Sequence, residues 1–214
     1  CISGRHEKVG AEPAEERCKV ILMPTHLNRS NKMPSKGVLI LECSKESDPG
    51  SEGRFVSHML DLMEVPHKYV KVKNKEDLVN RLQSSPFRII HIATHGVFKK
   101  SKRDKKFIGI WTPTGKLKQS DMELLKDKLE EHTIVCTACL SADKQFSEKI
   151  IEATGCLHYV APIGSPYFHD AIFFAHIFYH KHFILKRSVR KSIGQYSRTY
   201  KNPHRFVIKS QEKV

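Results

Sequence analysis

Short apolar runs recur along the chain, and stretches with helical spacing separate them. The runs lie at residues 38–41, 87–93, 133–137 and 157–162. Each run has the length of a buried strand and is too short for a helix. Between the first two, Leu78, Val79 and Leu82 recur at the spacing of one helix face. Strands that alternate with helices in this way are typical of βαβ units. The sequence therefore predicts an α/β fold with a mostly parallel central sheet and helices on both faces.

The same patterns indicate where the folded part begins and ends. We expect residues 1–34 to be a lead-in or linker, residues 35–200 to form the α/β domain, and residues 201–214 to be a basic tail. The chain starts at Cys1 without a methionine, which indicates a piece of a longer protein.

Local signals predict two of the helices. One helix is predicted from apolar residues at helical spacing, which we expect to face the core: Phe55, Met59, Leu62 and Met63. Ser141 is expected to cap a later helix, and Gly155 is expected to end it.

Charge and cysteine content limit the partners and the compartment. Lysine and arginine number 37 against 23 aspartates and glutamates, which gives a net charge of +14. This charge predicts an acidic partner or surface and leaves nucleic acid, anionic membrane and acidic protein open. The 6 cysteines are scattered, without the spacing of a zinc ribbon. We therefore expect free thiols in a reducing cytoplasm.

The sequence shows no motif for a cofactor, a metal or a membrane span. It has no glycine-rich phosphate loop and no H-E-x-x-H, so we expect neither a cofactor nor a metal. The most apolar stretch, residues 171–185, is interrupted by histidines and a lysine and is too short and too polar to span a bilayer.

Two of the predicted strands lead into residues that can perform nucleophilic chemistry. The run 87–93 leads into His95 and Gly96, and the run 133–137 leads into Cys139. In open α/β sheets, sites form at the carboxyl edge of the strands. A thiolate is a nucleophile, and an imidazole beside it can take the thiol proton and later donate it to a leaving amine. The backbone N–H groups of Gly96 and Cys139 are candidates to bind the developing oxyanion.

Each of these residues alone has a simpler structural explanation. A histidine at a strand end is more often structural, and a cysteine near a strand is more often part of the core. Because both follow strands of the same predicted sheet, we favour a functional site over these alternatives.

The two strand ends also match a family pattern. Ile89–Gly96 is an apolar strand that ends in His-Gly, and Ile134–Cys139 is an apolar strand that ends in Thr-Ala-Cys. A later apolar run at residues 160–164 is followed by His169-Asp170-Ala171. These segments resemble the CHAT peptidases, caspase-like domains related to separase. Thr137 is a mild departure, since serine is commoner at that position of the family.

The resemblance covers about residues 36–185 and implies a caspase-like fold with a cysteine endopeptidase activity. It implies that His95 and Cys139, rather than His91 and Cys136, form the catalytic dyad. CHAT domains often answer to sensor domains or partner proteins, and many serve in defence or programmed death. A protein substrate and an activating sensor domain or partner are therefore expected for a regulated effector.

The resemblance also suggests a substrate pocket. In this clan, the pocket for the residue before the scissile bond lies beside the nucleophile. The matching positions here are Glu42, Thr137 and the loop Gly164–Asp170, which includes Ser165. The carboxylates of Glu42 and Asp170 would favour arginine or lysine in the substrate. Asp170 has a second interpretation as the cap of the helix that follows, and both roles stay open here.

Basic segments support an alternative to an enzyme. Residues 98–106 are expected to form a basic loop, and the stretch after Leu185 mixes basic with aromatic residues. Such segments are most often solvated surface, although they can also bind acidic proteins or single-stranded nucleic acid. The alternative is a catalytically silent caspase-like module that binds an acidic protein or nucleic acid. The intact His95, Gly96 and Cys139 favour the peptidase.

Overall fold

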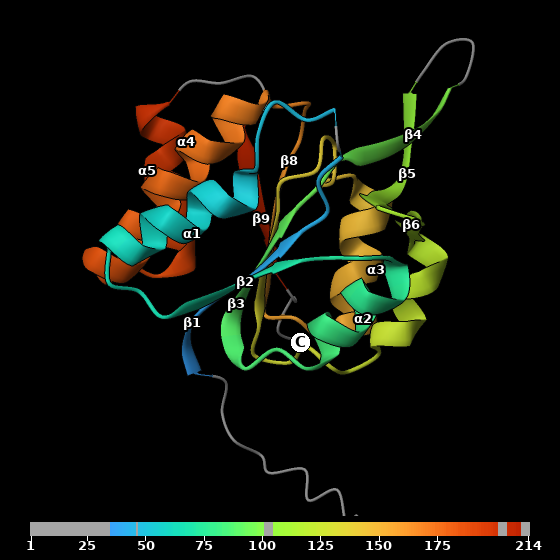
Figure 1. Ribbon diagram of the computed structural model, residues 1–214, viewed down its shortest axis with the longest axis horizontal. Helices are drawn as coiled ribbons and strands as arrows, with labels where there is room; N and C mark the ends of the chain where they lie inside the picture. Colours follow the sequence, from blue (N-terminus) through green and yellow to red (C-terminus); the bar gives the residue numbers. More distant parts are fainter. Residues whose placement is uncertain (1–34, 46, 101–104, 201–204, 211–214) are drawn as a thin grey trace, which may run out of the picture. The chain divides into compact units, whose positions relative to one another are not determined.

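A mostly parallel sheet runs through the centre of the fold (Figure 1). The computed structural model describes residues 35–45, 47–100, 105–200 and 205–210, so the lead-in expected at residues 1–34 lies outside the described residues. Within these ranges the sheet has 6 strands in the order β2-β1-β3-β7-β8-β9. The strands are β1 (Ser35–Glu42), β2 (His67–Lys71), β3 (Phe87–Ala93), β7 (Thr133–Cys136), β8 (His158–Pro162) and β9 (Phe206–Ser210). Only the β8–β9 pair is antiparallel, which confirms the predicted sheet.

Helices cover both faces of this sheet (Figure 1). One face carries α1 (Glu52–Leu62), α4 (Phe168–Tyr179) and α5 (Val189–Thr199). The other carries α2 (Lys75–Gln83), the 3₁₀ helix η1 (Gln119–Leu125) and α3 (Lys144–Thr154). A short π-helical turn, η2 (His180–Ile184), follows α4.

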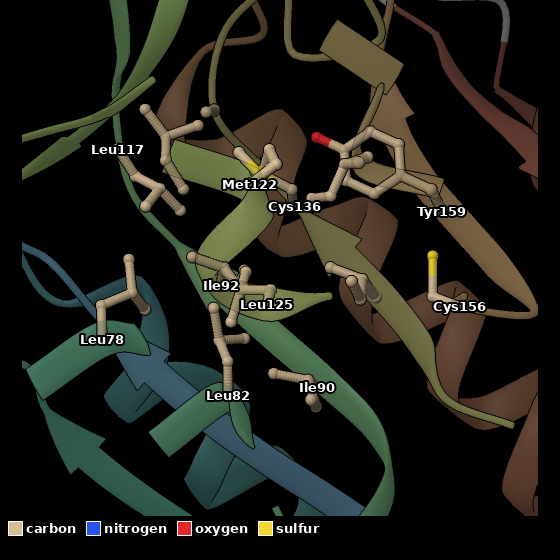
Figure 2. Packing of buried hydrophobic residues seen from close by; sticks show 14 of the residues in the cluster. Leu78, Leu82, Ile90, Ile92, Leu117, Met122, Leu125, Cys136, Cys156 and Tyr159 are labelled. Atoms are coloured by element: carbon tan, nitrogen blue, oxygen red, sulfur yellow. The ribbon is translucent and has the colours of Figure 1, made fainter. Parts of the chain in front are cut away.

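Burial on both faces explains the continuous apolar runs of the strands. Val38, Leu39, Ile40 and Leu41 of β1 are all buried, although successive side chains point to opposite faces. Two hydrophobic cores result, one on each side of the sheet. Figure 2 shows the core on the α2 and α3 side, where side chains from α2, β3 and η1 meet.

The buried stripe of α1 differs from the prediction. The helix is present, but Phe55 and Leu62 are 43% and 89% exposed, whereas Val56, Met59 and Leu60 face the core. Both stripes have helical spacing and share Met59, so periodicity alone could not separate them.

The cap of α3 also differs from the prediction. Asp143 accepts a hydrogen bond from the Phe146 N–H (3.1 Å) and is the N-cap, whereas the Ser141 hydroxyl donates to the Ala138 carbonyl (2.7 Å). Ser141 therefore stabilises the turn that contains Cys139. Gly155 ends the helix as predicted, with φ of 70°.

The basic segment at residues 98–106 belongs largely to strands rather than to a loop. It lies in a second, antiparallel sheet of β4 (Gly96–Lys100), β5 (Lys105–Thr112) and β6 (Gly115–Lys118), although residues 101–104 lie outside the described ranges. Phe98 and Phe107 pair across β4 and β5 with ring centroids 6.0 Å apart, which supplies the apolar contact that the hairpin needs.

The central sheet extends past residue 200, where the tail was expected to begin. Phe206 of β9 is buried and stacks on Phe174 of α4, with ring centroids 3.7 Å apart. An aromatic side chain in a basic segment thus fixes this strand at the edge of the sheet.

Candidate active site

The strand order brings His95 and Cys139 to the same edge of the sheet. β3 and β7 are adjacent and parallel, and His95 and Cys139 follow their carboxyl ends. Gly96 contacts the backbone of Cys139 so closely that a Cβ at this position would lie 2.3 Å from the Cys139 carbonyl oxygen. Only glycine allows this approach, so the His-Gly sequence and the cysteine turn are matched to each other.

A carboxylate that the sequence analysis did not identify orients His95. The Nε2 atom of His95 lies 2.8 Å and 3.0 Å from the two carboxylate oxygens of Asp48. A carboxylate only accepts, so Nε2 carries a proton and Nδ1 is the nitrogen left to exchange one. The side chain of Asp48 is 11% exposed and that of His95 is 40% exposed. The carboxylate of Asp48 is therefore largely buried, whereas the imidazole of His95 is accessible.

Neighbouring backbone groups hold both members of this pair. The Lys45 N–H donates to Asp48 Oδ2 (2.7 Å), and the Trp111 N–H donates to the His95 carbonyl (2.8 Å). The ring of Trp111 meets the imidazole edge-on, with centroids 6.4 Å apart. One sequence signal could have identified Asp48, namely its place in an Asp-Pro-Gly turn after the first strand. Since β1 pairs with β3 in parallel, a residue that follows β1 lies at the same edge of the sheet as His95.

The thiol of Cys139 is half-buried beneath the loop that follows β8. Its Sγ lies 4.0 Å from the Pro166 carbonyl oxygen. Burial raises the pKa of the Cys139 thiol, and the Ser165 side chain partly opposes this shift. The free thiol is therefore mainly neutral and needs a base. Among the described residues no hydrogen bond joins Cys139 to His95, and such contacts often tighten only when substrate binds.

A buried polar network lies next to this edge. The Glu52 carboxylate, at the start of α1, accepts a hydrogen bond from the Thr137 hydroxyl (3.0 Å) and lies 2.9 Å from His91 Nε2. The other nitrogen of His91 lies 2.8 Å from the hydroxyl of Tyr179. His91 is fully buried, so these contacts link α1, β3 and α4 inside the protein.

Three carboxylates line a small pocket beside His95. They belong to Glu42, Asp48 and Glu52, and the pocket has a volume of about 30 Å3. Glu42 is almost fully buried and accepts hydrogen bonds from the hydroxyls of Ser51 and Tyr69. The pocket is thus acidic and, in this state, large enough for about one water molecule.

Comparison with protein families gives the family of this chain. The model of the CHAT domain matches residues 16–158 of the 214 residues. The chain belongs to the CHAT-domain family. This family is one of caspase-like cysteine peptidases, and the six-stranded α/β architecture is the caspase-like fold that the sequence predicted.

Two solved structures show a distant resemblance to this CHAT domain. The RcsB response regulator of Salmonella typhimurium is 10% identical, with a TM-score of 0.40 over 80% of this chain and 73% of that chain. A flavodoxin of Streptococcus pneumonia TIGR4 is 11% identical, with a TM-score of 0.39 over 70% of this chain and 99% of that chain. No curated protein matches the chain. None of the helices in the described ranges is long and apolar enough to cross a membrane.

The predicted pocket residues occupy different positions in the CHAT domain. Ser165 lies beside the Cys139 thiol, and Thr137 is buried and bonded to Glu52. Asp170 is 3% exposed, and its carboxylate caps α4 by accepting a hydrogen bond from the Tyr167 N–H (3.0 Å). It also accepts one from the Tyr200 hydroxyl (2.7 Å). The structure thus shows the capping contact, which is one of the two roles considered for Asp170.

Proposed function

We propose that this CHAT domain is a cysteine endopeptidase in which Cys139 is the nucleophile and His95 is the general base. The observation that carries the proposal is the meeting of the two strand ends, with Gly96 against the Cys139 backbone and Asp48 against the imidazole. Neither contact is needed for strand pairing, and both are needed to present a thiol and an oriented base at one edge.

The chemistry follows from these positions. Nδ1 of His95 takes the proton from the Cys139 thiol, and the sulfur attacks the carbonyl carbon of the scissile bond. The N–H groups of Gly96 and Cys139 stabilise the oxyanion of the tetrahedral intermediate. This intermediate collapses to a thioester, and the imidazolium gives its proton to the departing amine. Water then hydrolyses the thioester with His95 again as base, which restores the thiol.

The raised pKa of the Cys139 thiol supports a regulated effector. A half-buried neutral thiol reacts slowly until a base is brought into contact with it. An activating partner or sensor domain that closes the gap between His95 and Cys139 would therefore switch the activity on.

A peptide library tests the activity directly. We expect wild-type protein to cleave a subset of peptides and Cys139→Ala to cleave none, with an unchanged melting temperature. Cys136 is 1% exposed in the core, so Cys136→Ala should lower stability by about 1–2 kcal/mol and retain cleavage. Equal loss of activity in both variants, without loss of stability, would mean that the wrong thiol was chosen. No cleavage by wild-type protein, alone or with an activating partner, would favour the silent binding module.

We further propose a preference for a basic residue before the scissile bond. The support is the acidic pocket beside His95, in which the Glu42 carboxylate is almost fully buried and so acts strongly on a guanidinium at contact. The pocket must widen to admit such a side chain, since its volume is about 30 Å3.

Fluorogenic peptides that differ only at this residue measure the preference. We expect arginine substrates to be cleaved faster than aspartate ones, and Glu42→Gln to reduce the difference. Asp170→Asn should leave it unchanged, because Asp170 caps α4. Faster cleavage of aspartate substrates would contradict the pocket assignment.

A further inference from the structure

A groove lined by lysines lies beside the candidate active site. It has a volume of about 800 Å3 and takes residues from the end of β2, the loop after β1 and the end of β5. We call it the lysine groove, and its lining includes Lys45, Lys71, Lys73, Trp111, Ser44 and Ser47. We propose that the lysine groove binds an acidic segment of the substrate polypeptide. This inference rests on the proposed peptidase function.

The lining of the lysine groove is positively charged. Lys45, Lys71 and Lys73 are exposed, and no carboxylate belongs to the described lining of the groove. None of these lysines pairs with a carboxylate in the part of the chain that the structure describes. Two nearby acids contact the backbone of these lysines and are paired elsewhere. Asp77 accepts a hydrogen bond from the Lys73 backbone N–H and is paired with Arg81 at 2.8 Å, and Asp48 accepts one from the Lys45 backbone N–H and is paired with His95 at 2.8 Å. Three ammonium groups that lack a described carboxylate partner share one concave surface, and such a surface attracts anions.

The lysine groove is continuous with the candidate active site. Ser44 lines both the lysine groove and the acidic pocket beside His95. Trp111 lies in the wall of the groove, and its backbone N–H donates a hydrogen bond to the His95 carbonyl (2.8 Å). A chain whose scissile bond lies at Cys139 therefore reaches the groove without leaving this edge of the sheet.

The same surface fits polypeptide better than nucleic acid. Single-stranded nucleic acid stacks successive bases on several aromatic rings. The lysine groove has one aromatic ring, Trp111, and the ammonium of Lys45 lies over it, 5.3 Å from the ring centroid. Acidic side chains need no stacking platform, only the ammonium groups.

The lysine groove and the acidic pocket together would select substrates by the order of their charged residues. A substrate would place a basic residue at the carboxylates of the pocket and acidic residues at the lysines of the groove. A reversed or shifted chain meets like charges, which selects one register. Three of the lysines that contribute to the net charge of +14 would then act at this groove.

Binding is measured with the whole chain carrying Cys139→Ala, so that no substrate is consumed. Trp111 is the only tryptophan of the sequence, and its fluorescence therefore reports on the groove itself. A peptide of ten glutamates is titrated into the protein, and a peptide of ten glutamines serves as the neutral control. We expect a saturable change of emission with the glutamate peptide only, weakening as salt is added.

Charge reversal in the groove supplies the decisive comparison. Lys71→Glu with Lys73→Glu should weaken binding about tenfold or more, and the milder pair Lys71→Gln with Lys73→Gln serves if the first fails to fold. Lys68→Glu, an exposed site on the same strand outside the groove, should change affinity by less than about twofold.

Three results would overturn the proposal. They are an unchanged Trp111 emission, an equal loss of affinity in Lys68→Glu, and tighter binding of a ten-nucleotide thymidine oligomer with the same dependence on Lys71 and Lys73. Cleavage by wild-type protein without a Trp111 response would leave the peptidase intact and reject the groove. Glutamate-peptide binding without any cleavage would leave the groove and reject the peptidase.

Discussion

The contact between Asp48 and His95 decides which nitrogen of the imidazole can meet the thiol. Both carboxylate oxygens lie within 3.0 Å of Nε2, and the Lys45 N–H holds the carboxylate in place. These contacts fix the orientation of the ring and leave Nδ1 free of Asp48. In the proposed mechanism Asp48 is a positioning residue, because it touches the base rather than the substrate.

Asp48→Asn should lower kcat by about 10- to 100-fold and leave KM nearly unchanged, since a misplaced base costs rate rather than binding. An asparagine can offer its N–H₂ to Nε2 and so favour the wrong tautomer. Steady-state kinetics on one peptide would measure the effect. Asp61→Asn, at a side chain that is 65% exposed, is the matched control. A rise in KM at constant kcat would assign Asp48 to substrate binding instead.

At the level of elements, the site depends on how tightly β4 begins against the turn after β7. The space at Gly96 is bounded by the Cys139 carbonyl at 2.3 Å and by the Phe98 ring at 2.9 Å from a Cβ placed there. The carbonyl is backbone and cannot rotate aside. The second sheet therefore contributes to the candidate active site through its first residue as well as through Trp111.

Gly96→Ala should reduce cleavage by about 100-fold or more, because the added methyl separates the two strand ends. It should also lower the free energy of unfolding by about 1–3 kcal/mol through overpacking. Gly194→Ala is the control, since a Cβ there meets nothing within 4 Å and lies in helix α5. That variant should gain up to about 1 kcal/mol of stability. Chemical denaturation and peptide cleavage measure both effects, and a fully active Gly96→Ala would show that the close contact is dispensable.

For the whole molecule, buried thiols tie the stability of the fold to alkaline pH. Burial raises the pKa of Cys43 from 9.0 to about 12 and that of Cys156 from 9.0 to about 11. Above pH 9 the unfolded chain loses these thiol protons, whereas the folded chain keeps them. The unfolded state then binds fewer protons, so stability falls as pH rises.

We expect the free energy of unfolding to be level between pH 7 and 8 and to fall between pH 9 and 10, by about 1 kcal/mol for each such thiol per pH unit. Urea denaturation at a series of pH values measures this slope. A Cys43→Ala/Cys156→Ala double variant should be less stable at pH 7 but show a shallower decline. Equal slopes for the two proteins would contradict the assignment to these thiols.

Local pattern was enough to place the buried strands at residues 38–41, 87–93, 133–137 and 157–162 and the two reactive residues after them, whereas it assigned β4 to a loop and β9 to a tail. Apolar runs buried on both faces reveal a parallel sheet, and the carboxyl ends of its strands share one edge, so His95 and Cys139 could be paired without coordinates. The capping role of Asp170 was also readable as one of two alternatives, because a helix cap depends on its own helix alone.

Other features depend on segments far apart in the chain, which no local pattern brings together. Asp48 contacts His95 across 47 positions, and it does so only because β1 lies beside β3 in the sheet. The lysine groove likewise needs the end of β2, the loop after β1 and the end of β5 to meet. Which stripe of α1 is buried depends on the surface of the sheet that it covers. Strand order and packing set these contacts, because they arise from burial shared among elements rather than from the residues of any one of them.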